Sequence, residues 1–273
     1  MPELPEILNL SRQMDRELRN QEIQSVSVLQ EKCVNLPVDD FINKLRGKRV
    51  GEITHRGKWV FMRLEPEAWL LLNLGMGGNV ILHRDREGLP DKYQLLIEFA
   101  DGAVLSIGFW WFGYVHLVDD EGLKRHQMTA RLGPTPLRDP GFTRDCFINL
   151  LKGRKGSVKS FLTNQANVAG IGNVYIQDTL FRACLHPLRG VQSLTEEEKS
   201  LLYDGMMETL REAADLGGLA HEKDLYDRPG GFEDFLVGYR EGKECPRCGT
   251  VIVKIKTGST SSYICPQCQP EGK

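Results

Sequence analysis

The sequence lacks any run of about 18 uncharged apolar residues, so none of its segments is a candidate for crossing a membrane as a helix. Its first residues also lack the basic region and apolar core of a secretion signal, because acids stand there at Glu3 and Glu6. A cytoplasmic protein with no membrane partner is therefore expected.

The sequence also lacks a large excess of charge of either sign. It has 35 Lys and Arg against 37 Asp and Glu, a formal net charge of −2, which excludes a protein that is basic throughout. The total therefore argues weakly against a nucleic-acid partner, since phosphate binding normally leaves a basic footprint. The distribution argues the other way, because residues 150–160 contain no acid and four basic side chains, namely Lys152, Arg154, Lys155 and Lys159.

At 273 residues the chain has room for two or three hydrophobic cores. Apolar spacings of three and four predict a helix over Leu4–Leu18, and short alternating runs from Ile23 to about Leu117 predict a sandwich or barrel of antiparallel strands. Asp101-Gly102 between two of these runs predicts a hairpin turn. A stretch rich in proline and glycine then predicts a linker, and helical patterns follow it. The expected fold class is multi-domain α+β, with a β-sandwich domain at 1–131, a linker at 132–141, a helical domain at 142–238 and a small cysteine-rich domain at 239–273.

Four of the seven cysteines lie near the end of the chain, as CPRC at 245–248 and CPQC at 265–268. Two such pairs are typical of one tetrahedral Zn²⁺ site, whose metal supplies the folding energy that so small a segment lacks. A thioredoxin-like redox pair needs only one CxxC and leaves the other pair unexplained. The sequence therefore predicts one structural zinc ion bound by Cys245, Cys248, Cys265 and Cys268.

Five further motifs stand out along the chain: MPELPE at the start, RGK at 56–58, LGMGG at 74–78, LGPTPL at 132–137 and AGIGNVYIQDTLFRACLHP at 169–187. Together with the cysteine pairs, they resemble the formamidopyrimidine-DNA glycosylase / endonuclease VIII family nearly from end to end. The resemblance implies a catalytic N-terminal β-sandwich, a helix–two-turn–helix domain and a zinc ribbon that clasp duplex DNA and flip out a damaged base. The implied activity is that of a base-excision-repair DNA glycosylase with an associated abasic-site lyase activity.

The resemblance also assigns chemistry to the first residues. Removal of Met1 leaves Pro2 with a free secondary amine, which in the family attacks C1′ of the damaged nucleotide and forms an iminium that undergoes β-elimination. Glu3 matches the family's acid/base residue, and Glu6 matches its second glutamate. Lys58 matches the lysine that contacts the phosphate and the damaged site. Without the resemblance, Pro2-Glu3 is an ordinary helix start with an acid that the helix dipole favours.

Three further residues match family positions that contact DNA. Met76 matches the wedge that fills the gap left by the flipped base, and Asn173 matches the asparagine that holds the phosphate beside the lesion. Lys159 falls where the family carries a basic residue near this phosphate path. The alternatives are an ordinary turn or core methionine at 76 and a solvated surface lysine at 159.

One departure from the family falls on the loop that reads the opposite base. Members specific for oxidised purines carry an Asp-Pro-Arg-Arg-Phe-Gly loop, whereas this chain has GFWWFG at 108–113. Tryptophan can stack but cannot make the arginine's bidentate contact with the orphaned cytosine. We therefore expect Trp110 or Trp111 to enter the duplex, with opposite-base selection relaxed or altered. The alternative is that both tryptophans are buried in the sandwich.

A second departure is Thr260, which stands five residues before the third cysteine of the ribbon. The family has an arginine there that clamps the phosphates at the lesion, so its loss should weaken the complex by a few kcal/mol. Lys254 and Lys256 are candidates to compensate. A smaller departure is Asp178, where many relatives have glutamate.

The leading hypothesis is thus a glycosylase and lyase that acts on double-stranded damaged DNA. It is expected to work as a monomer associated with the nucleoid, with zinc and without a small-molecule cofactor. A protein of the same architecture that binds damaged or abasic DNA with little excision is the alternative, because the two arginines are missing. A zinc protein acting on proteins or RNA is a third class, which DNA affinity falling steeply with salt would exclude. The base removed is expected to be an oxidised one, and its identity stays open.

Overall fold

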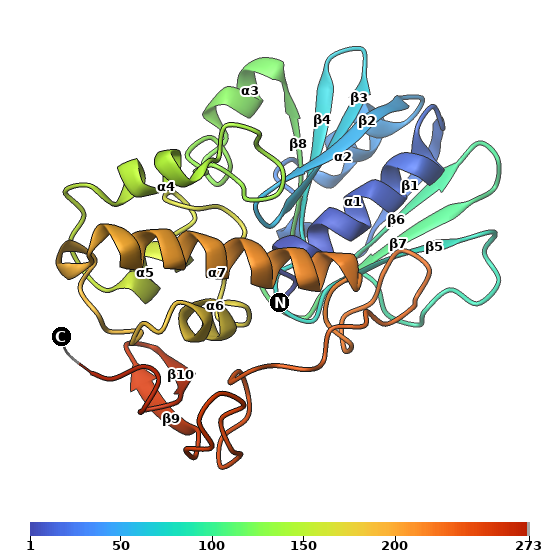
Figure 1. Cartoon of the computed structure of the whole chain (residues 1–273). Coiled ribbons are helices and arrows are strands. Elements are labelled where there is room, and N and C mark those ends of the chain that lie inside the picture. The colour runs from blue at the N-terminus through green and yellow to red at the C-terminus, as the bar shows by residue number, and fades with distance from the viewer. Residues whose placement is uncertain (272–273) are drawn as a thin grey trace. The chain divides into compact units, whose positions relative to one another are not determined.

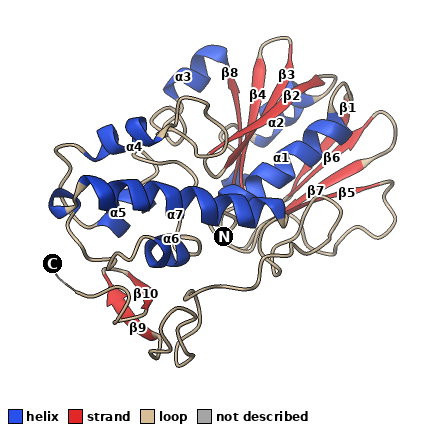
Figure 2. Cartoon of the chain, viewed as in Figure 1, coloured by secondary structure: helices blue, strands red, loops and turns tan. Residues whose placement is uncertain are grey.

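The structure is a computed structural model that describes residues 1–271, and it divides into two compact units (Figure 1). The first unit consists of Met1–Arg131 and Leu216–Gly231, and the second consists of Leu132–Asp215 and Phe232–Lys273. Figure 2 shows that most strands belong to the first unit and most helices to the second. Within the part of the chain that is described, none of the helices combines the length and apolar character that a membrane crossing requires.

Two four-stranded antiparallel sheets form the body of the first unit. One sheet has the order β1-β6-β7-β5, with β1 at Ile23–Val28, β6 at Leu95–Phe99, β7 at Val104–Gly108 and β5 at Asn79–His83. The other has the order β2-β3-β4-β8, with β2 at Arg49–Arg56, β3 at Trp59–Glu65, β4 at Ala68–Asn73 and β8 at Tyr114–Asp119. Buried side chains from both sheets form a single hydrophobic core, so the predicted antiparallel sandwich is confirmed.

Helix α1 (Leu4–Leu18) precedes the sandwich and has the predicted bounds. Its apolar residues recur every three or four positions and therefore lie on one face, and these buried side chains join the core of the sandwich. Pro5 is tolerated because it lies in the first turn, where its missing N–H would have no partner within the helix. The helix thus places the first residues of the chain at one fixed point of the first unit.

The hairpin turn between β6 and β7 is also confirmed. Gly102 has a φ of 92°, a conformation that glycine adopts without the steric cost of a side chain. Asp101 supports the turn because its Oδ1 accepts a hydrogen bond from the Ala103 N–H at 3.0 Å. A turn with this local chemistry is readable from sequence.

Helix α2 (Val38–Leu45) interrupts the region that the sequence analysis assigned to strands, and this part of the assignment is wrong. Pro37 is the N-cap residue of this helix, and Phe41 and Leu45 are its only buried residues. Eight residues with two buried positions are too few to show a helical period against the alternation of the neighbouring strands. Helix α3 (Asp120–Arg125) follows β8, and η1 (Glu31–Cys33) is a short 3₁₀ turn after β1.

The second unit is mainly helical, as predicted, with α4 at Arg144–Leu151, α5 at Val158–Thr163, α6 at Ile176–Arg182, the 3₁₀ turn η2 at Val191–Ser193 and α7 at Glu196–Asp215. Thr143 and Ser157 cap α4 and α5, since their hydroxyl oxygens accept hydrogen bonds from backbone N–H groups of the first turn. An antiparallel hairpin of β9 (Val253–Thr257) and β10 (Thr260–Ile264) lies near the end of the chain. The multi-domain α+β fold class is therefore confirmed.

The segment Leu216–Gly231 returns to the first unit after α7. Residues Gly218 to Phe235 are rich in glycine, aspartate and proline, which predicts a long mobile loop. The structure shows how the part of it up to Gly231 is attached to α1. Gln13 donates through Nε2 to Asp224 Oδ2 at 2.9 Å and accepts through Oε1 from the Leu225 N–H at 2.9 Å. The Leu225 carbonyl in turn accepts from the Leu82 N–H of β5. The segment is thus bonded to both α1 and the sandwich.

Candidate functional site

The start of α1 is a capping box built from two buried glutamates. The backbone N–H of Glu3 donates to Glu6 Oε2 at 2.7 Å, and the Glu3 side chain accepts from the Glu6 backbone N–H. The other carboxylate oxygen of Glu6 accepts from the Leu219 N–H at 2.9 Å. Glu6 therefore holds both the first turn of α1 and the segment Leu216–Gly231, next to the buried Pro2.

Lys58 approaches this turn from the connection between β2 and β3. Its Nζ lies 3.7 Å from Glu3 Oε1, and the two side chains are only 13% and 3% exposed. A charge pair that is shielded from water interacts more strongly than a surface pair. The structure thus brings Lys58 to the Pro2-Glu3 dipeptide, although the two are far apart in the sequence.

Glu222 is a third carboxylate at this place, and sequence reasoning missed it. The ammonium group of Met1, which is still attached to Pro2, pairs with Glu222 Oε1 at 3.2 Å. Nothing in the local stretch GLAHEKD distinguishes this glutamate from its charged neighbours. Its position depends on the bonds that attach the segment Leu216–Gly231 to α1.

Met76 and the two tryptophans lie on neighbouring loops of the first unit. The Met76 N–H donates to the Trp111 carbonyl at 2.9 Å, and the Trp110 N–H donates to the Met76 carbonyl at 3.0 Å. Trp110 is 81% exposed, Trp111 63% and Met76 42%, so the alternatives of buried tryptophans and a core methionine are wrong. Phe112 is 69% exposed beside them and was missed, although its adjacency to the tryptophans was a usable signal.

Glycines allow these two loops to approach each other closely. Gly75 and Gly77 have φ values of 54° and 63°. A Cβ atom on Gly75 would lie 2.1 Å from the Trp111 carbonyl oxygen, and one on Gly77 would lie 2.6 Å from the Trp110 ring. A side chain at 75 would therefore displace the backbone of the loop opposite, and a side chain at 77 would displace the Trp110 ring.

Asn73 links this pair of loops to the turn that carries Lys58. Its Nδ2 donates to the Lys58 carbonyl at 3.0 Å, and its Oδ1 accepts from the Gly75 N–H at 3.1 Å. The lysine turn and the two loops therefore lie at the same end of the sandwich. This end carries both the candidate reactive groups and the exposed aromatic side chains.

In the second unit, Lys159 is only 5% exposed, so the alternative of a solvated surface lysine is wrong. Its Nζ lies 2.8–2.9 Å from four oxygens of the β9–β10 hairpin, which are Thr257 Oγ1, Thr260 Oγ1, Ser261 O and Ser262 Oγ. Burial lowers the pKa of Lys159 to about 8, because water no longer stabilises the ammonium and these oxygens are uncharged. The structure thus places Lys159 and the exposed Thr260, which were predicted separately, in direct contact.

Asn173 lies partly exposed just before α6. Its carbonyl and Oδ1 accept from Gln177 Nε2 at 2.7 and 3.4 Å. Gln177 Oε1 accepts in turn from the Tyr263 N–H of β10 at 3.0 Å. Gln177 therefore connects the Asn173 turn to the hairpin that encloses Lys159.

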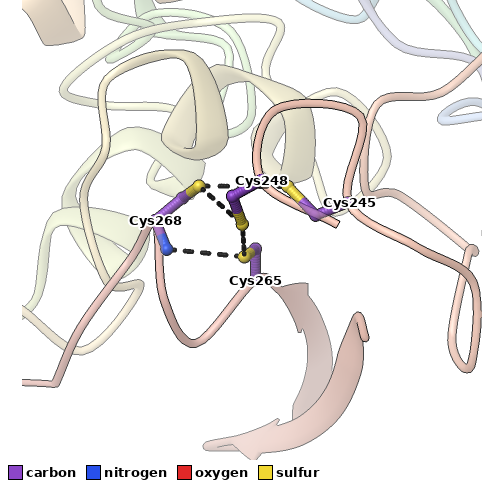
Figure 3. Close-up of side chains that lie close together, drawn as sticks. All are labelled: Cys245, Cys248, Cys265 and Cys268. Carbon is purple, nitrogen blue, oxygen red and sulfur yellow. Dashed lines mark hydrogen bonds between the residues drawn. The ribbon is translucent and has the colours of Figure 1, made fainter. Parts of the chain in front are cut away.

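The four cysteines of the C-terminal segment come together as predicted, with all four sulfurs within 4.8 Å of one another (Figure 3). A Zn–S distance of about 2.3 Å places the sulfurs of a tetrahedral site about 3.8 Å apart. The Cys245–Cys268 and Cys248–Cys265 sulfur separations are 3.9 and 3.5 Å. The geometry and the thiol donor set therefore fit one tetrahedral zinc ion.

Three family models match the chain. The formamidopyrimidine-DNA glycosylase N-terminal domain matches residues 1–108, and the formamidopyrimidine-DNA glycosylase H2TH domain matches residues 132–223. The zinc finger found in FPG and IleRS matches residues 242–270. Together with the clustered sulfurs, the third match identifies a site for one structural zinc ion.

Curated relatives match over almost their whole length. The formamidopyrimidine-DNA glycosylase of Ligilactobacillus salivarius is 32% identical, over 98% of this chain and 99% of its own. That of Roseiflexus sp. is 35% identical, over 98% of this chain and 100% of its own. 

Solved structures of Lactococcus lactis Fpg match equally well. A complex of the wild-type protein with DNA containing N7-benzyl-Fapy-dG has a TM-score of 0.90 at 28% identity and covers 99% of this chain and 100% of that one. A complex with DNA containing an abasic site has a TM-score of 0.89 at 28% identity and covers 98% of this chain and 100% of that one.

Similarity of this extent, in sequence and in fold, makes the protein a DNA glycosylase of base-excision repair, an enzyme class that acts on damaged bases in DNA. Its homologues combine this activity with that of an abasic-site (AP) lyase, and the protein shares both. The chain belongs to the formamidopyrimidine-DNA glycosylase family.

Proposed function

We propose that this enzyme removes an oxidised base through a covalent intermediate on Pro2 and then cleaves the strand by β-elimination. The observation that carries the proposal is the shielded Glu3–Lys58 pair beside Pro2 at the start of α1. While Met1 is attached, the Pro2 nitrogen is an amide and has no basic lone pair. Removal of Met1 leaves Pro2 with a secondary amine whose reference pKa is about 8, so a useful fraction of this amine is unprotonated at neutral pH.

The proposed reaction uses this amine as the nucleophile. The Pro2 nitrogen attacks C1′, and the glycosidic bond breaks with its electron pair leaving on the base, which takes up a proton. The C1′–O4′ bond then opens to give an iminium between Pro2 and C1′, with Glu3 placed to pass a proton to O4′. Loss of a 2′ proton and departure of the 3′ phosphate complete the elimination. The Lys58 ammonium contributes positive charge beside the sugar and phosphate.

Glu6 completes the proposed catalytic set as a positioning residue. Both of its carboxylate oxygens accept backbone N–H groups, one from Glu3 and one from Leu219. It therefore fixes Glu3 and the segment Leu216–Gly231 relative to each other. This segment carries Glu222, which lies close enough to the start of the chain to pair with its ammonium group.

DNA contacts are proposed for both units. Exposure and proximity support Met76 with Trp110 or Trp111 as the side chains that enter the duplex when the base is flipped. The remaining contacts are proposed to go to phosphates and involve Asn173, Lys159 and Thr260. A phosphate would supply Lys159 with the negative charge that its hydroxyl partners lack.

The wider setting is proposed from the same similarity. Lactococcus lactis Fpg has been solved in complexes with DNA containing Fapy-dG, N7-benzyl-Fapy-dG or an abasic site, and we propose double-stranded DNA with an oxidised base as the substrate here. We propose further that the enzyme is a monomer associated with the nucleoid and needs no small-molecule cofactor. The proposed functional domains are 1–131 and 142–238, joined by a linker at 132–141, and the zinc ribbon at 239–273.

A damaged-DNA-binding protein with little excision is the second candidate function. Thr260 favours it, because a threonine hydroxyl cannot replace the charge and bidentate geometry of an arginine on a phosphate. Efficient excision is preferred, since Pro2, Glu3 and Lys58 lie together at the start of α1.

Borohydride trapping distinguishes the two candidates. The protein, with removal of Met1 checked by mass, is incubated with duplexes carrying an abasic site or one of several oxidised bases opposite each normal base. Reduction fixes the iminium as a covalent adduct, which we expect from the wild-type protein and not from Pro2→Gly. Protein that retains Met1 is the control and should form no adduct. Tight binding of abasic DNA without any adduct from the trimmed wild-type protein would refute the covalent step and favour the binding protein.

The opposite base tests the role of Trp110. Replacing Trp110 by Arg supplies two donors that can contact the orphaned cytosine. We therefore expect the Trp110→Arg variant to gain preference for cytosine as the opposite base. A gain of about tenfold or more corresponds to one good bidentate contact, roughly 1–3 kcal/mol. Trp110→Phe keeps a stacking ring and should leave the preference as in the wild type. Equal preferences in wild type and Trp110→Arg, measured as excision rates, would count against the assignment.

A further inference from the structure

The aromatic tip, defined here as Trp110, Trp111 and Phe112, exposes three rings, whereas the duplex role proposed above uses only one of the two tryptophans. Trp110 is the most exposed of the large hydrophobic side chains among the described residues, and the other two are each more than 60% exposed. Exposed contiguous aromatic side chains in a soluble protein commonly mark a binding surface. Three neighbouring rings in solvent therefore call for a ligand with flat apolar faces.

The tip is a built structure, because its backbone is bonded on both sides. The Phe109 N–H donates to Gln94 Oε1 at 2.8 Å, and the Met76 loop bonds to both tryptophans. Phe112 has a φ of 56°, a conformation that costs a residue other than glycine free energy. Backbone bonds on either side hold the rings outward, as a platform for a partner requires.

The chemistry of the tip favours stacking over reading of base edges. Neither GFWWFG at 108–113 nor LGMGG at 74–78 contains a charged side chain, and the only side-chain donors are the two indole N–H groups. Stacking of a base on an aromatic side chain contributes about 1–3 kcal/mol and is possible for every base. Such a surface binds bases irrespective of their sequence or pairing.

Unpaired DNA loses the fewest hydrogen bonds when it binds such a surface. When a base is flipped from a duplex, its partner loses its hydrogen bonds, and the tip offers that partner no bidentate set in return. In a single strand or a bubble the lesion has no paired partner, so no base pair has to be broken. The bases beside the lesion are also free to stack on the rings. Both effects shift preference toward unpaired substrates.

The tip lies where bound bases would be close to the reactive groups. Asn73 bonds to the Lys58 carbonyl and to the Gly75 N–H of the Met76 loop, and this loop bonds to the tip. Lys58 in turn pairs with Glu3. Bases stacked on the tip therefore lie at the end of the sandwich that carries the proposed nucleophile.

We propose that the substrates of this enzyme include lesions in single-stranded and unpaired DNA, with the aromatic tip as the stacking platform that binds the bases next to the lesion. The inference rests on the proposed function, since it assigns a further substrate class to the same Pro2 chemistry. It concerns how DNA is held and leaves the chemical steps unchanged.

The test compares one lesion in three settings. An oligonucleotide with a single abasic site is presented as a single strand, inside a bubble of unpaired bases, and in a fully paired duplex, and single-turnover cleavage is measured over a range of enzyme concentrations. We expect the wild-type enzyme to cleave the single strand and the bubble within about tenfold of the duplex. Trp111→Ala and Trp110→Ala should each raise the enzyme concentration needed for half-maximal cleavage of the single strand by about tenfold, the equivalent of one stacked base. The same concentration for the duplex should rise less.

Leu29→Ala is the matched control, because Leu29 is an apolar residue of the first unit that is as exposed as Trp111, directly after β1 and outside the proposed site. It should cleave all three substrates as the wild type does. Cleavage of the duplex with single-strand and bubble rates at least about a thousandfold lower would overturn the inference and leave the proposed function intact. Equal single-strand binding by the wild type and both tryptophan variants would overturn the role of the tip. Absence of cleavage in all three settings would refute the proposed function itself.

Discussion

The buried ammonium of Lys159 weakens the folded state at neutral pH. Its pKa is lowered to about 8 by burial, whereas an unfolded lysine titrates at about 10.4. Between these values the unfolded chain binds more protons at this site than the folded chain, so stability rises with pH across this window. Below about pH 8 the cost is fully present. A charge held at such a cost is understandable if it contacts DNA.

Replacing Lys159 by Met should therefore remove this pH dependence and impair DNA binding. Relative to the wild type, we expect the stability of the Lys159→Met variant to fall by about 2 kcal/mol between pH 7 and pH 10, because only the wild type loses the cost of a buried ammonium over this range. Chemical denaturation at both pH values measures this change, and titration with abasic DNA measures the loss of affinity. Lys155→Met, at an exposed neighbouring lysine, is the control for stability. A stability difference between Lys159→Met and the wild type that is the same at both pH values would contradict this account.

Individual site residues were predictable to different degrees. The pairing of Lys58 with Glu3 was accessible only through the family resemblance, because the two are distant in sequence and no local pattern connects them. Glu222 was not predictable, since its place depends on how a long loop returns to α1. The hydroxyl surroundings of Lys159 were equally inaccessible, because they come from the distant β9–β10 hairpin.

Elements with strong local signals were predicted well. Helix α1 and the β6–β7 hairpin have the expected bounds and turn, because helical periodicity and Asp-Gly turn chemistry act between near neighbours in the chain. Helix α2 was missed because its eight residues bury only two side chains. The path of Leu216–Gly231 could not be predicted, because its hydrogen bonds go to α1, about two hundred residues away.

Helix α6 anchors the segment that leads into the zinc ribbon through one carboxylate. Asp178 is 1% exposed and accepts hydrogen bonds from the backbone N–H groups of Leu236, Val237 and Gly238 at 2.7–3.0 Å. These three donors would otherwise be without partners in a largely buried segment. The aspartate that departs from the family's usual glutamate is thus fully used in this chain.

Replacing Asp178 by Ala should destabilise the second unit strongly. Each backbone N–H left without an acceptor costs about 1–3 kcal/mol, and we expect a total loss of about 3 kcal/mol after relaxation. Chemical denaturation followed by zinc release reports on this unit. Asp234→Ala removes an exposed carboxylate from the same segment and should change stability by less than about 0.5 kcal/mol. Similar values for the two variants would show that the three hydrogen bonds contribute little.

Electrostatic attraction to DNA must be local, because the net charge of the protein is −2. The connection between α4 and α5 carries Lys152, Arg154 and Lys155, all exposed, and none of them forms an ion pair with any residue in 1–271. Cations without acidic neighbours release counterions from DNA when they approach phosphates. This connection is therefore expected to contribute to affinity in a salt-dependent manner.

Neutralising this connection should reduce the salt dependence of binding. In the triple variant with Lys152, Arg154 and Lys155 replaced by Gln, we expect the slope of log affinity against log salt to fall by about 2 to 3, near 0.9 for each lost phosphate contact. The control variant has Arg19, Arg86 and Lys124 replaced by Gln. It loses the same amount of charge, but from side chains that already pair with acids. Equal changes in slope for both variants would indicate that net charge, and no particular contact, governs binding.

The glycines beneath the aromatic tip make it a module in two parts. A side chain at 77 would collide with the Trp110 ring, and one at 75 with the Trp111 carbonyl. Residues 108–113 therefore cannot be exchanged for another loop without regard to residues 74–78. A chimaera that takes only one of these two segments from this protein would lose the shape of the platform, even if its catalytic residues were unchanged. Loop grafting between relatives, in the laboratory or in evolution, must move both segments together.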